Sequence, residues 1–304
     1  MINFILLFIY ISIGFVLKKS KLPVQNLHLK LNKFIISIAL PAMVLLETPK
    51  LEFSMDNMIP VYIAWATMIG SVLLVLLASK RYHFSKDVTA CLMLVSVLTN
   101  STFVGIPVIT VYYGAESLPF IVLYDQLGTS LWLATYATII VAYYSNHETV
   151  SFTSVTKKVL RFPPFIAFLF AVLFSLFFSE YNYPDLMTKV LEIITLAIVP
   201  CALISVGLQL QFKLDTNEIK PFTVSLVIKL ILSPLIAIMI CYIFGWSDLL
   251  IAKVSIMEAA MPAMITAGLI ASINGFAPRL SNAIVAYGIA ISLLSSWLVY
   301  LIIN

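Results

Sequence analysis

Charged residues are scarce in this sequence. Asp, Glu, Lys and Arg account for 11% of the 304 residues, while 62% of the residues are hydrophobic. A soluble globular domain carries roughly 25% charged residues, and the mean hydropathy here is +1.05. The shortage of charge therefore excludes an ordinary soluble domain. We expect no nucleic-acid partner and no cofactor.

Cysteine and histidine are also rare. The three cysteines lie within apolar stretches, at Cys91, Cys201 and Cys241, so we expect free thiols and no disulfide framework. The three histidines fall in predicted loops, at His28, His83 and His147. An intramembrane protease would need paired aspartates or a Ser–His arrangement at membrane depth, and the sequence offers neither, so we expect no enzyme.

The hydrophobic residues form blocks of roughly 18–27 residues, the length that spans about 30 Å of hydrocarbon as a helix. The blocks predict an all-α polytopic membrane protein in the lipid bilayer. The ten predicted helices lie at about residues 2–17, 29–47, 57–79, 87–113, 118–144, 162–179, 187–210, 221–244, 249–275 and 281–303.

Basic residues are distributed unevenly between the predicted loops. Fourteen of the 18 Lys and Arg residues fall in the odd-numbered loops, among them Lys18, Lys80, Lys157 and Arg279. By the positive-inside rule these loops face the cytoplasm. The chain is thus predicted to lie in the cytoplasmic membrane with both termini outside. Its first apolar block has a basic cluster after it and none before it, so we expect a retained helix rather than a signal peptide.

The predicted helices divide into two halves of five, residues 1–144 and 145–304. The second half then enters the membrane from the opposite side, so any duplication would be inverted. An offset of 159 residues places Pro41 on Pro200 and Val95-Ser96 on Val254-Ser255. Chance alignment of apolar sequence is the alternative. Several matches near one offset favour an inverted five-plus-five repeat, in which helices 4 and 9 are equivalent.

Helices 4 and 9 are each interrupted by polar residues and a proline, within Asn100–Pro107 and Glu258–Pro262. An unwound backbone at membrane depth must be buried in protein or line a wet cavity. Discontinuous helices at matching positions indicate the binding site of a secondary transporter. A single proline would fit an ordinary kinked helix, whereas the pair favours two crossed discontinuous helices.

Pro107 and Pro262 are expected to begin new half-helices. The N-terminus of a half-helix carries unpaired N–H groups and partial positive charge, so amides at residues 105–108 and 262–264 would bind a carboxylate. The predicted substrate-binding residues are Asn100, Ser101, Thr102, Gly105, Pro107, Met261, Pro262 and Ala263.

Three ionisable residues lie deepest in the predicted spans, at Asp125, Lys229 and Glu258. Charge at such depth is costly and indicates function, so we predict that these residues serve ion coupling. Glu258 would carry a proton, bind Na⁺ together with Asn100 and Ser101, or form a structural ion pair with Lys229. For Asp125 the alternative is that it satisfies hydrogen bonds within the bundle.

Several segments carry a resemblance to a known family. They are Gly14–Lys19 in helix 1, Leu40-Pro41-Ala42 in helix 2, Asn100–Pro107 in helix 4, the Asp125 segment of helix 5, Val199–Leu203 with Gly207 in helix 7, Lys229 with Pro234 in helix 8, and Met261-Pro262-Ala263 in helix 9. With these motifs the chain resembles the auxin efflux carrier family over essentially its whole length. The helix 4 motif is the most specific of them.

The resemblance implies an inverted-repeat fold distantly related to the bile acid:sodium symporters. A scaffold of helices 1, 2, 6 and 7 would hold a transport unit of helices 3–5 and 8–10, which moves like an elevator, and a homodimer is expected. The implied substrates are small organic anions, carboxylates or dicarboxylates. Glu258 departs from the family, whose residues before the helix 9 proline are usually small and neutral. An acidic residue there is reminiscent of the sodium-coupled relatives, so the coupling ion is left open between H⁺ and Na⁺. A sensor that keeps the fold without flux is a further alternative, as is a channel.

Overall fold

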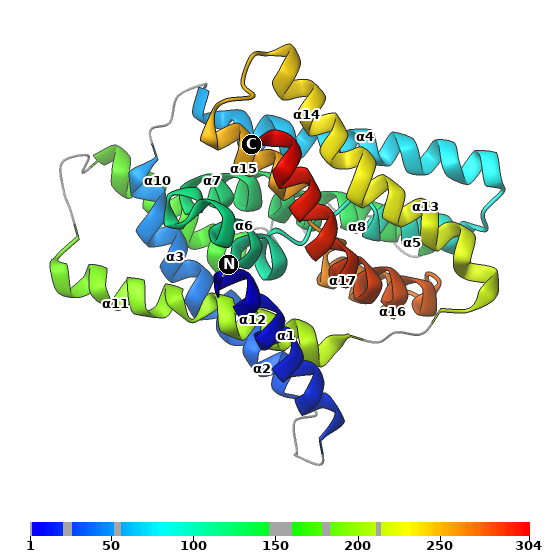
Figure 1. Ribbon diagram of the computed structural model, residues 1–304, viewed down its shortest axis with the longest axis horizontal. Coiled ribbons are helices and arrows are strands. Elements are labelled where there is room, and N and C mark those ends of the chain that lie inside the picture. Colours follow the sequence, from blue (N-terminus) through cyan, green and yellow to red (C-terminus); the bar gives the residue numbers. More distant parts are fainter. Residues whose placement is uncertain (1, 21–25, 52–55, 146–159, 178–182, 211–213) are drawn as a thin grey trace.

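The computed structural model describes residues 2–20, 26–51, 56–145, 160–177, 183–210 and 214–304, and this part of the chain is helical without a β-strand (Figure 1). Six helical runs are long and apolar enough to cross a membrane, and they are Leu27–Lys50, Ile59–Tyr82, Ala115–Ser145, Asp185–Gln209, Thr216–Ile243 and Pro278–Ile303. Ser101–Tyr113 and Pro163–Ser175 are shorter apolar helices. The predicted all-α polytopic membrane protein is confirmed, and the count of ten spans stays a prediction.

The α-helices in chain order are α1 (Ile2–Lys19), α2 (Leu27–Phe34), α3 (Leu40–Glu47), α4 (Ile59–Tyr82), α5 (Lys86–Val95), α6 (Ile106–Tyr113), α7 (Leu118–Leu123), α8 (Leu131–Ser145), α10 (Pro163–Phe177), α11 (Asp185–Leu196), α12 (Ile198–Gln209), α13 (Ile219–Val227), α14 (Ser233–Ile243), α15 (Leu250–Ala259), α16 (Ile265–Ile273) and α17 (Pro278–Ile303). Four π-helical segments join or begin helices, and they are η1 (Ile35–Ala39), η4 (Ser101–Gly105), η6 (Tyr124–Ser130) and η8 (Ile228–Leu232).

Proline sets the start of many of these helices. It occupies the first or second position of α3, α4, α6, α7, α14 and α17. At that position the missing N–H has no intrahelical partner to lose, and the fixed φ angle already suits a helix. The side chain of Ser85 starts α5 differently, by accepting a hydrogen bond from the N–H of Val88 at 3.3 Å. Such an N-terminal cap satisfies one of the free amides of the first turn.

One group of helices, the flanking group, consists of α1, α2, α3, α10, α11 and α12. Within it α1 packs along α12, and α3 packs against α10 and α11. Gly14 of α1 and Gly207 of α12 bring two backbones into contact, since a Cβ added at either glycine would overlap a main-chain carbonyl oxygen of the other helix. Small residues at such a crossing allow the close helix packing typical of membranes.

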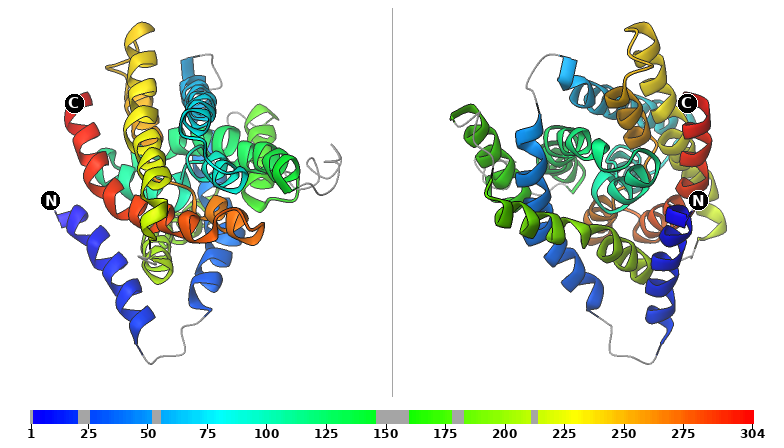
Figure 2. Two further views of the ribbon diagram at one scale, coloured as in Figure 1. Left: turned by 90° about the vertical axis from the view of Figure 1, so that its right-hand side faces the viewer. Right: turned by 60° about the vertical axis from the view of Figure 1, so that its left-hand side comes forward.

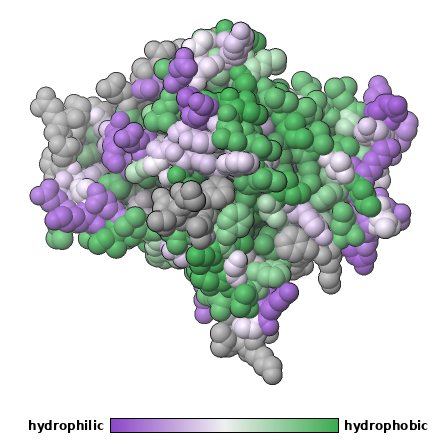
Figure 3. Space-filling model, viewed as in Figure 1, coloured by the Kyte–Doolittle hydropathy of each residue, from purple (hydrophilic) through white to green (hydrophobic). Residues whose placement is uncertain are grey.

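The remaining helices, α4–α8 and α13–α17, form the crossing group. In it α4 packs against α14 and α15, and α16 packs against α5 and α17. In Figure 2 the blue helices α1 and α2 extend beyond the crossing group and approach each other at the lower margin of the molecule. The two termini lie on the same side. In Figure 3 hydrophobic residues cover much of the visible face, and hydrophilic residues gather toward its margins. An apolar belt of this kind is what a bilayer requires.

Candidate functional site

The two interrupted segments meet and hydrogen-bond to each other. The chain leaves helical geometry between Val95 and Ser101, and again between Ala259 and Ile265. The N–H of Asn100 donates to the carbonyl oxygen of Pro262 at 2.9 Å, and the N–H of Met264 donates to Leu98 O at 3.0 Å. Thr99 and Ala263 thus form an isolated antiparallel bridge. Each unwound stretch supplies hydrogen-bond partners to backbone groups of the other. Non-helical backbone is tolerated inside a membrane protein when its polar groups are paired in this way. We call this region the crossing.

The half-helices do not begin where the prolines suggested. Helical geometry resumes at Ser101, six residues before Pro107, and at Ile265, three residues after Pro262. The expectation of free amides at residues 105–108 is wrong for Gly105 and Ile106, which donate to the carbonyl oxygens of Asn100 and Ser101. The wide π-helical turn produces these bonds by adding one residue to the ring that each hydrogen bond closes.

On the other side of the crossing the same expectation fails for two of the three residues. Pro262 has no N–H to offer, and the N–H of Met264 is used in the pairing with Leu98. The amides that remain there are that of Ala263, which donates no backbone hydrogen bond in the described chain, and those of Ile265, Thr266 and Ala267 in the first turn of α16, ahead of the first intrahelical bond from Gly268 to Met264. A helix N-terminus leaves such groups without a partner in the helix.

Asn100 caps the second half of its own segment. Its Oδ1 accepts a hydrogen bond from the N–H of Phe103 at 3.2 Å. The Nδ2 of the same side chain is buried and has no hydrogen-bond partner in the described residues. The crossing therefore contains one side-chain donor that is available to an acceptor brought in from outside.

Asp125 lies at the second position of η6 and is enclosed by donors. Its carboxylate accepts from the hydroxyl of Ser101, from Thr102 Oγ1 at 3.1 Å, from Gln126 Nε2 at 2.8 Å and from Ser130 Oγ at 3.5 Å. Ser101 and Thr102 belong to η4, so these bonds tie the η6 bulge to the crossing. The alternative considered for Asp125, that it satisfies hydrogen bonds within the bundle, describes its surroundings well.

Lys229 occupies the corresponding position of a second bulge, η8. Its ammonium is buried and donates to Thr99 Oγ1 at 2.5 Å. Thr99 lies in the unwound stretch from the other half of the chain, so Lys229 anchors the crossing from the side of α13 and α14. π-Helical bulges are frequent at functional sites because they turn a side chain out of the regular helical pattern.

Glu258 lies in the last turn of α15 and has a different environment. It is fully buried, and neither carboxylate oxygen has a hydrogen-bond partner among the residues described. The carboxylate packs directly against Gly105, where an added Cβ would lie 2.7 Å from Oε1 and 2.8 Å from Oε2. The ion pairs of the described chain do not include one between Glu258 and Lys229.

The structure therefore brings Asn100, Ser101, Thr102 and Gly105 together with Glu258, Asp125 and Lys229 at one place. Met261, Pro262 and Ala263 form the opposite strand of the crossing, and Pro107 lies in the first turn of α6. All eight residues predicted to bind substrate are buried. Of the three side chains predicted to hold Na⁺, only Glu258 keeps its oxygens unengaged, because Ser101 binds Asp125 and Asn100 caps η4.

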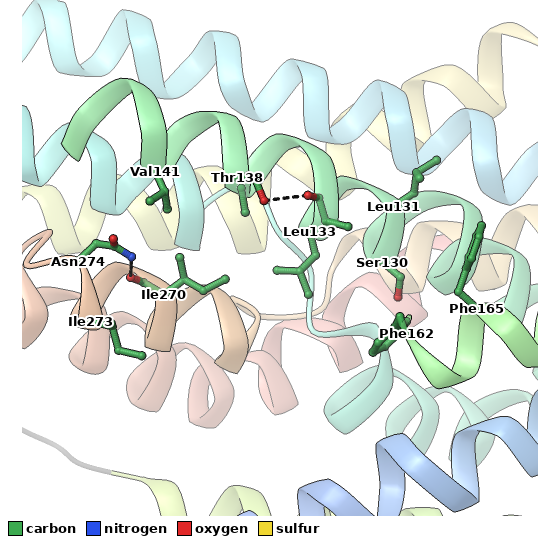
Figure 4. A pocket seen from close by; sticks show the side chains of 12 residues that line it. Ser130, Leu131, Leu133, Thr138, Val141, Phe162, Phe165, Ile270, Ile273 and Asn274 are labelled. Carbon is green, nitrogen blue, oxygen red and sulfur yellow. Dashed lines mark hydrogen bonds between the residues drawn. The ribbon is translucent and has the colours of Figure 1, made fainter. Parts of the chain in front are cut away.

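Two cavities contact α16, one near its start and one near its end, and neither is lined by the predicted substrate-binding residues. One cavity of about 420 Å³ is apolar and lies between α8, α10 and α16 (Figure 4). It reaches Ser130, the residue that bonds to Asp125. In Figure 4 the polar groups of Thr138 and Asn274 are bonded within their own helices rather than directed to a ligand.

The second cavity is polar and has a volume of about 680 Å³. Residues of α1, α2 and α12 line one side of it, and residues of α16 and α17 line the other. The side chains that sequence reasoning missed are here, at Lys18, His28, Asn32 and Gln209. Lys18 contributed to the predicted orientation and to the Gly14–Lys19 motif, and not to the predicted site. The available sequence signal was that these polar side chains lie near the ends of apolar blocks. The cavity that they face is visible only in the structure.

Comparison with known protein sequences shows what this chain is similar to. The family model described as "Membrane transport protein" matches residues 1–300. An uncharacterized transporter of Methanothermobacter thermautotrophicus is 27% identical over 292 residues, which cover 94% of this chain and 93% of that protein. An uncharacterized transporter of Methanocaldococcus jannaschii is 28% identical over 249 residues, which cover 78% of this chain and 77% of that protein.

Proposed function

Because the chain belongs to the membrane transport protein family, which is the auxin efflux carrier family recognised from its motifs, we propose that it is a secondary active transporter of a small organic anion across the cytoplasmic membrane. One observation carries the proposal. Two interrupted helices from the two halves of the chain pair through their backbones, and three buried ionisable side chains surround the pairing. A transporter of this kind binds its substrate and coupling ion at such interruptions.

The proposed motion carries the crossing group past the flanking group, in an inverted five-plus-five repeat. Two packing relations support this division. Helix α1 of the first half packs on α12 of the second half, and α10 of the second half packs on α3 of the first. The two halves therefore contact each other reciprocally. The flanking group is locked by the backbone contact at Gly14 and Gly207, as a fixed frame should be. The two cavities that contact α16 lie between the flanking group and the crossing group. Relative motion of the two groups would open and close them.

Glu258 is proposed to carry the coupling charge. A buried carboxylate without donors is strongly unfavourable when ionised, so it gains from a proton or from Na⁺. Lys229 and Asp125 supply opposite fields around it and hold the crossing in place. The substrate anion is proposed to accept a hydrogen bond from the side-chain Nδ2 of Asn100. It would also contact the first turn of α16, where N–H groups and partial positive charge attract it.

Reconstitution of the purified protein in liposomes tests the function. A thermal-shift screen against carboxylic acids, with and without Na⁺, first selects acids that stabilise the protein. Uptake of a selected acid should then saturate with concentration and should depend on an imposed H⁺ or Na⁺ gradient. Binding without flux would instead indicate a sensor, and flux that neither saturates nor couples would indicate a channel. Either result overturns the proposal.

A further inference from the structure

We infer that the groove between α1, α6 and α17 binds one acyl chain of a membrane glycerophospholipid, whose phosphate lies at Lys253. The groove has a volume of about 590 Å³. Phe8 lines it on the side of α1, and residues of α6 and α17 line the other sides. None of its lining residues belongs to the crossing or to the two cavities that contact α16.

The length of the groove matches one leaflet of a bilayer. Its α17 side is a stripe formed by Ala290, Leu293, Leu294, Trp297 and Tyr300, and residues three, four and seven positions apart share one face of a helix. From Ala290 to Tyr300 the helix rises about 15 Å at 1.5 Å per residue. This is half of the roughly 30 Å of hydrocarbon in a bilayer. The groove therefore has the length of one acyl chain.

The polarity of the groove changes along this length. Ala290 and the two leucines form the apolar end, and Trp297 and Tyr300 form the other end. Amphipathic rings of this kind are typical of the membrane–water interface. The indole N–H of Trp297, a residue 44% exposed, has no acceptor within the described chain. The ester carbonyl of a lipid whose acyl chain fills the apolar end would supply that acceptor.

A cation lies at the aromatic end of the groove. Lys253 Nζ donates to Asn304 Oδ1 at 3.2 Å, and Asn304 Nδ2 donates to Tyr113 OH at 2.8 Å and to the carbonyl oxygen of Tyr300 at 3.0 Å. The rings of Tyr113 and Tyr300 meet edge to face, with centroids 5.6 Å apart. Lys253 forms no ion pair with a described residue. Its charge and its remaining donors therefore suit a phosphate.

The surroundings of the groove identify its occupant. Helix α17 lies within a run long and apolar enough to cross a membrane, Pro278–Ile303. Leu294 lines the groove and is exposed, so hydrocarbon reaches it from the bilayer. A glycerophospholipid has an apolar chain, an ester carbonyl and a phosphate in the order in which the groove has an apolar end, the indole N–H and the ammonium. A diacylglycerol lacks the last of these parts.

The groove also lies between the two groups of helices. Phe8 belongs to the flanking group, and Val111 of α6 and Ala290 belong to the crossing group. Helix α6 directly follows η4, which carries part of the crossing. A bound molecule shifts a conformational equilibrium through contacts that differ between the states. Under the proposed function, a lipid in the groove would therefore alter the rate of uptake, whereas its binding does not depend on transport.

Lys253 has a simpler explanation that must be tested against this one. By holding Asn304 it would fix the last turn of α17 without any lipid. Lys253→Gln separates the two roles, because glutamine keeps an N–H donor for Asn304 and removes the charge. A purely structural role predicts no change in lipid affinity. A binding role predicts weaker binding of a phospholipid.

Native mass spectrometry of the purified full chain, in a detergent without phosphate, counts bound lipid and gives its affinity by titration. The probes are dioleoylphosphatidylglycerol and dioleoylglycerol, which share their chains and esters and differ in the phosphate headgroup. We expect one phosphatidylglycerol per chain to resist removal by detergent. Dioleoylglycerol should bind about tenfold more weakly, because it offers no charge to Lys253.

Two pairs of variants locate the site. Ala290→Phe fills the groove and should abolish retention of phosphatidylglycerol, whereas Ile291→Phe is the matched control, since Ile291 is exposed and does not line the groove. Lys253→Gln should weaken phosphatidylglycerol about tenfold, and Lys253→Arg should keep most of the affinity because the charge is kept. Lys189→Gln, which removes an exposed charge from α11, should have no effect.

Equal retention of phosphatidylglycerol by Ala290→Phe and Ile291→Phe would show that lipid binds only to the general surface of the protein, and would overturn the inference. Unchanged affinity in Lys253→Gln would overturn it as well. Equal affinity of the unmodified protein for the two lipids would also do so, and this comparison requires no variant to fold. Binding is measured without substrate or gradient, so the result is separate from the test of transport.

Discussion

Asp125 and Glu258 are two carboxylates buried at the same crossing, 2% and 0% exposed, and their surroundings differ completely. Asp125 accepts hydrogen bonds from four side chains, three of which are hydroxyls. Glu258 accepts none from the described residues and lies against the Cα of Gly105. The described protein therefore surrounds the first carboxylate with donors and gives the second none.

On this comparison we propose a structural role for Asp125 and a coupling role for Glu258. Depth in the membrane does not distinguish the two residues, because both are buried. The supply of donors does, since a charge enclosed by donors keeps one state through a transport cycle. A charge without donors changes its free energy strongly when a proton or cation binds. For this reason the proposed coupling role is assigned to Glu258.

The largest effect should come from Glu258→Gln. Glutamine has nearly the same shape but neither binds an exchangeable proton nor carries charge, so gradient-driven uptake should fall to background while the protein folds. Uptake in liposomes with imposed H⁺ and Na⁺ gradients measures this. Glu47→Gln is the control, because Glu47 is buried too but is paired with Lys50 at 2.9 Å. Unchanged coupling in Glu258→Gln would remove Glu258 from the mechanism.

A second change moves Glu258 without altering it. In Gly105→Ala the new methyl group would lie within 2.8 Å of both carboxylate oxygens, so the side chain must leave its position. Forcing a side chain off its rotamer costs on the order of 1 kcal/mol, which corresponds to about fivefold in the uptake rate. Gly288→Ala is the control, since its nearest neighbours lie at 3.6 and 3.8 Å.

The Gly105→Ala effect should also depend on Glu258. In the double variant with Glu258→Gln the alanine should add little to the loss, because residues in contact are not additive. Additive losses from the two changes would show that Gly105 acts on uptake by another route.

Asp125→Asn should act on stability more than on coupling. The amide nitrogen that replaces one carboxylate oxygen cannot accept from the hydroxyls around it, and hydrogen bonds to a charged group contribute about 2 kcal/mol each. We expect a clear fall in the unfolding temperature in detergent, with the preference for H⁺ or Na⁺ retained in whatever uptake remains. A variant as stable as the unmodified protein but uncoupled would place Asp125 beside Glu258 as a coupling residue and end the distinction drawn here.

The smaller of the two effects on stability should come from Thr99→Val, which removes the acceptor of Lys229 and keeps the shape of the side chain. Leaving a buried donor without this acceptor costs about 1–3 kcal/mol, so the unfolding temperature should fall modestly. Thr67→Val is the control, because Thr67 is buried and its hydroxyl donates to Ile63 O of its own helix at 2.8 Å. Equal stability of the two variants would show that the Lys229 contact does not hold the crossing.

Much of this architecture could be predicted before any coordinates. Block length and charge scarcity predicted a helical membrane protein, and proline with adjacent polar residues located both interruptions, since a helix cannot continue through them unchanged. The starts of the half-helices were placed wrongly because π-helical geometry depends on packing around η4 and leaves no composition signal. The free amides expected at Gly105 and Met264 were wrong for a related reason: each found a backbone partner that only folding supplied.

The sequence by itself determined the class of protein and the family. It also identified three ionisable residues, whose charge is costly in a bilayer and therefore indicates function. It did so because hydrocarbon penalises charge and unpaired backbone irrespective of the fold. Which carboxylate is enclosed by donors, and which cavity faces Lys18 and His28, was decided by tertiary structure alone. Those properties depend on how the folded chain brings separate segments together, as for Ser101 and Asp125, 24 positions apart, or Lys18 and Leu210, 192 positions apart. A one-dimensional pattern does not encode such contacts.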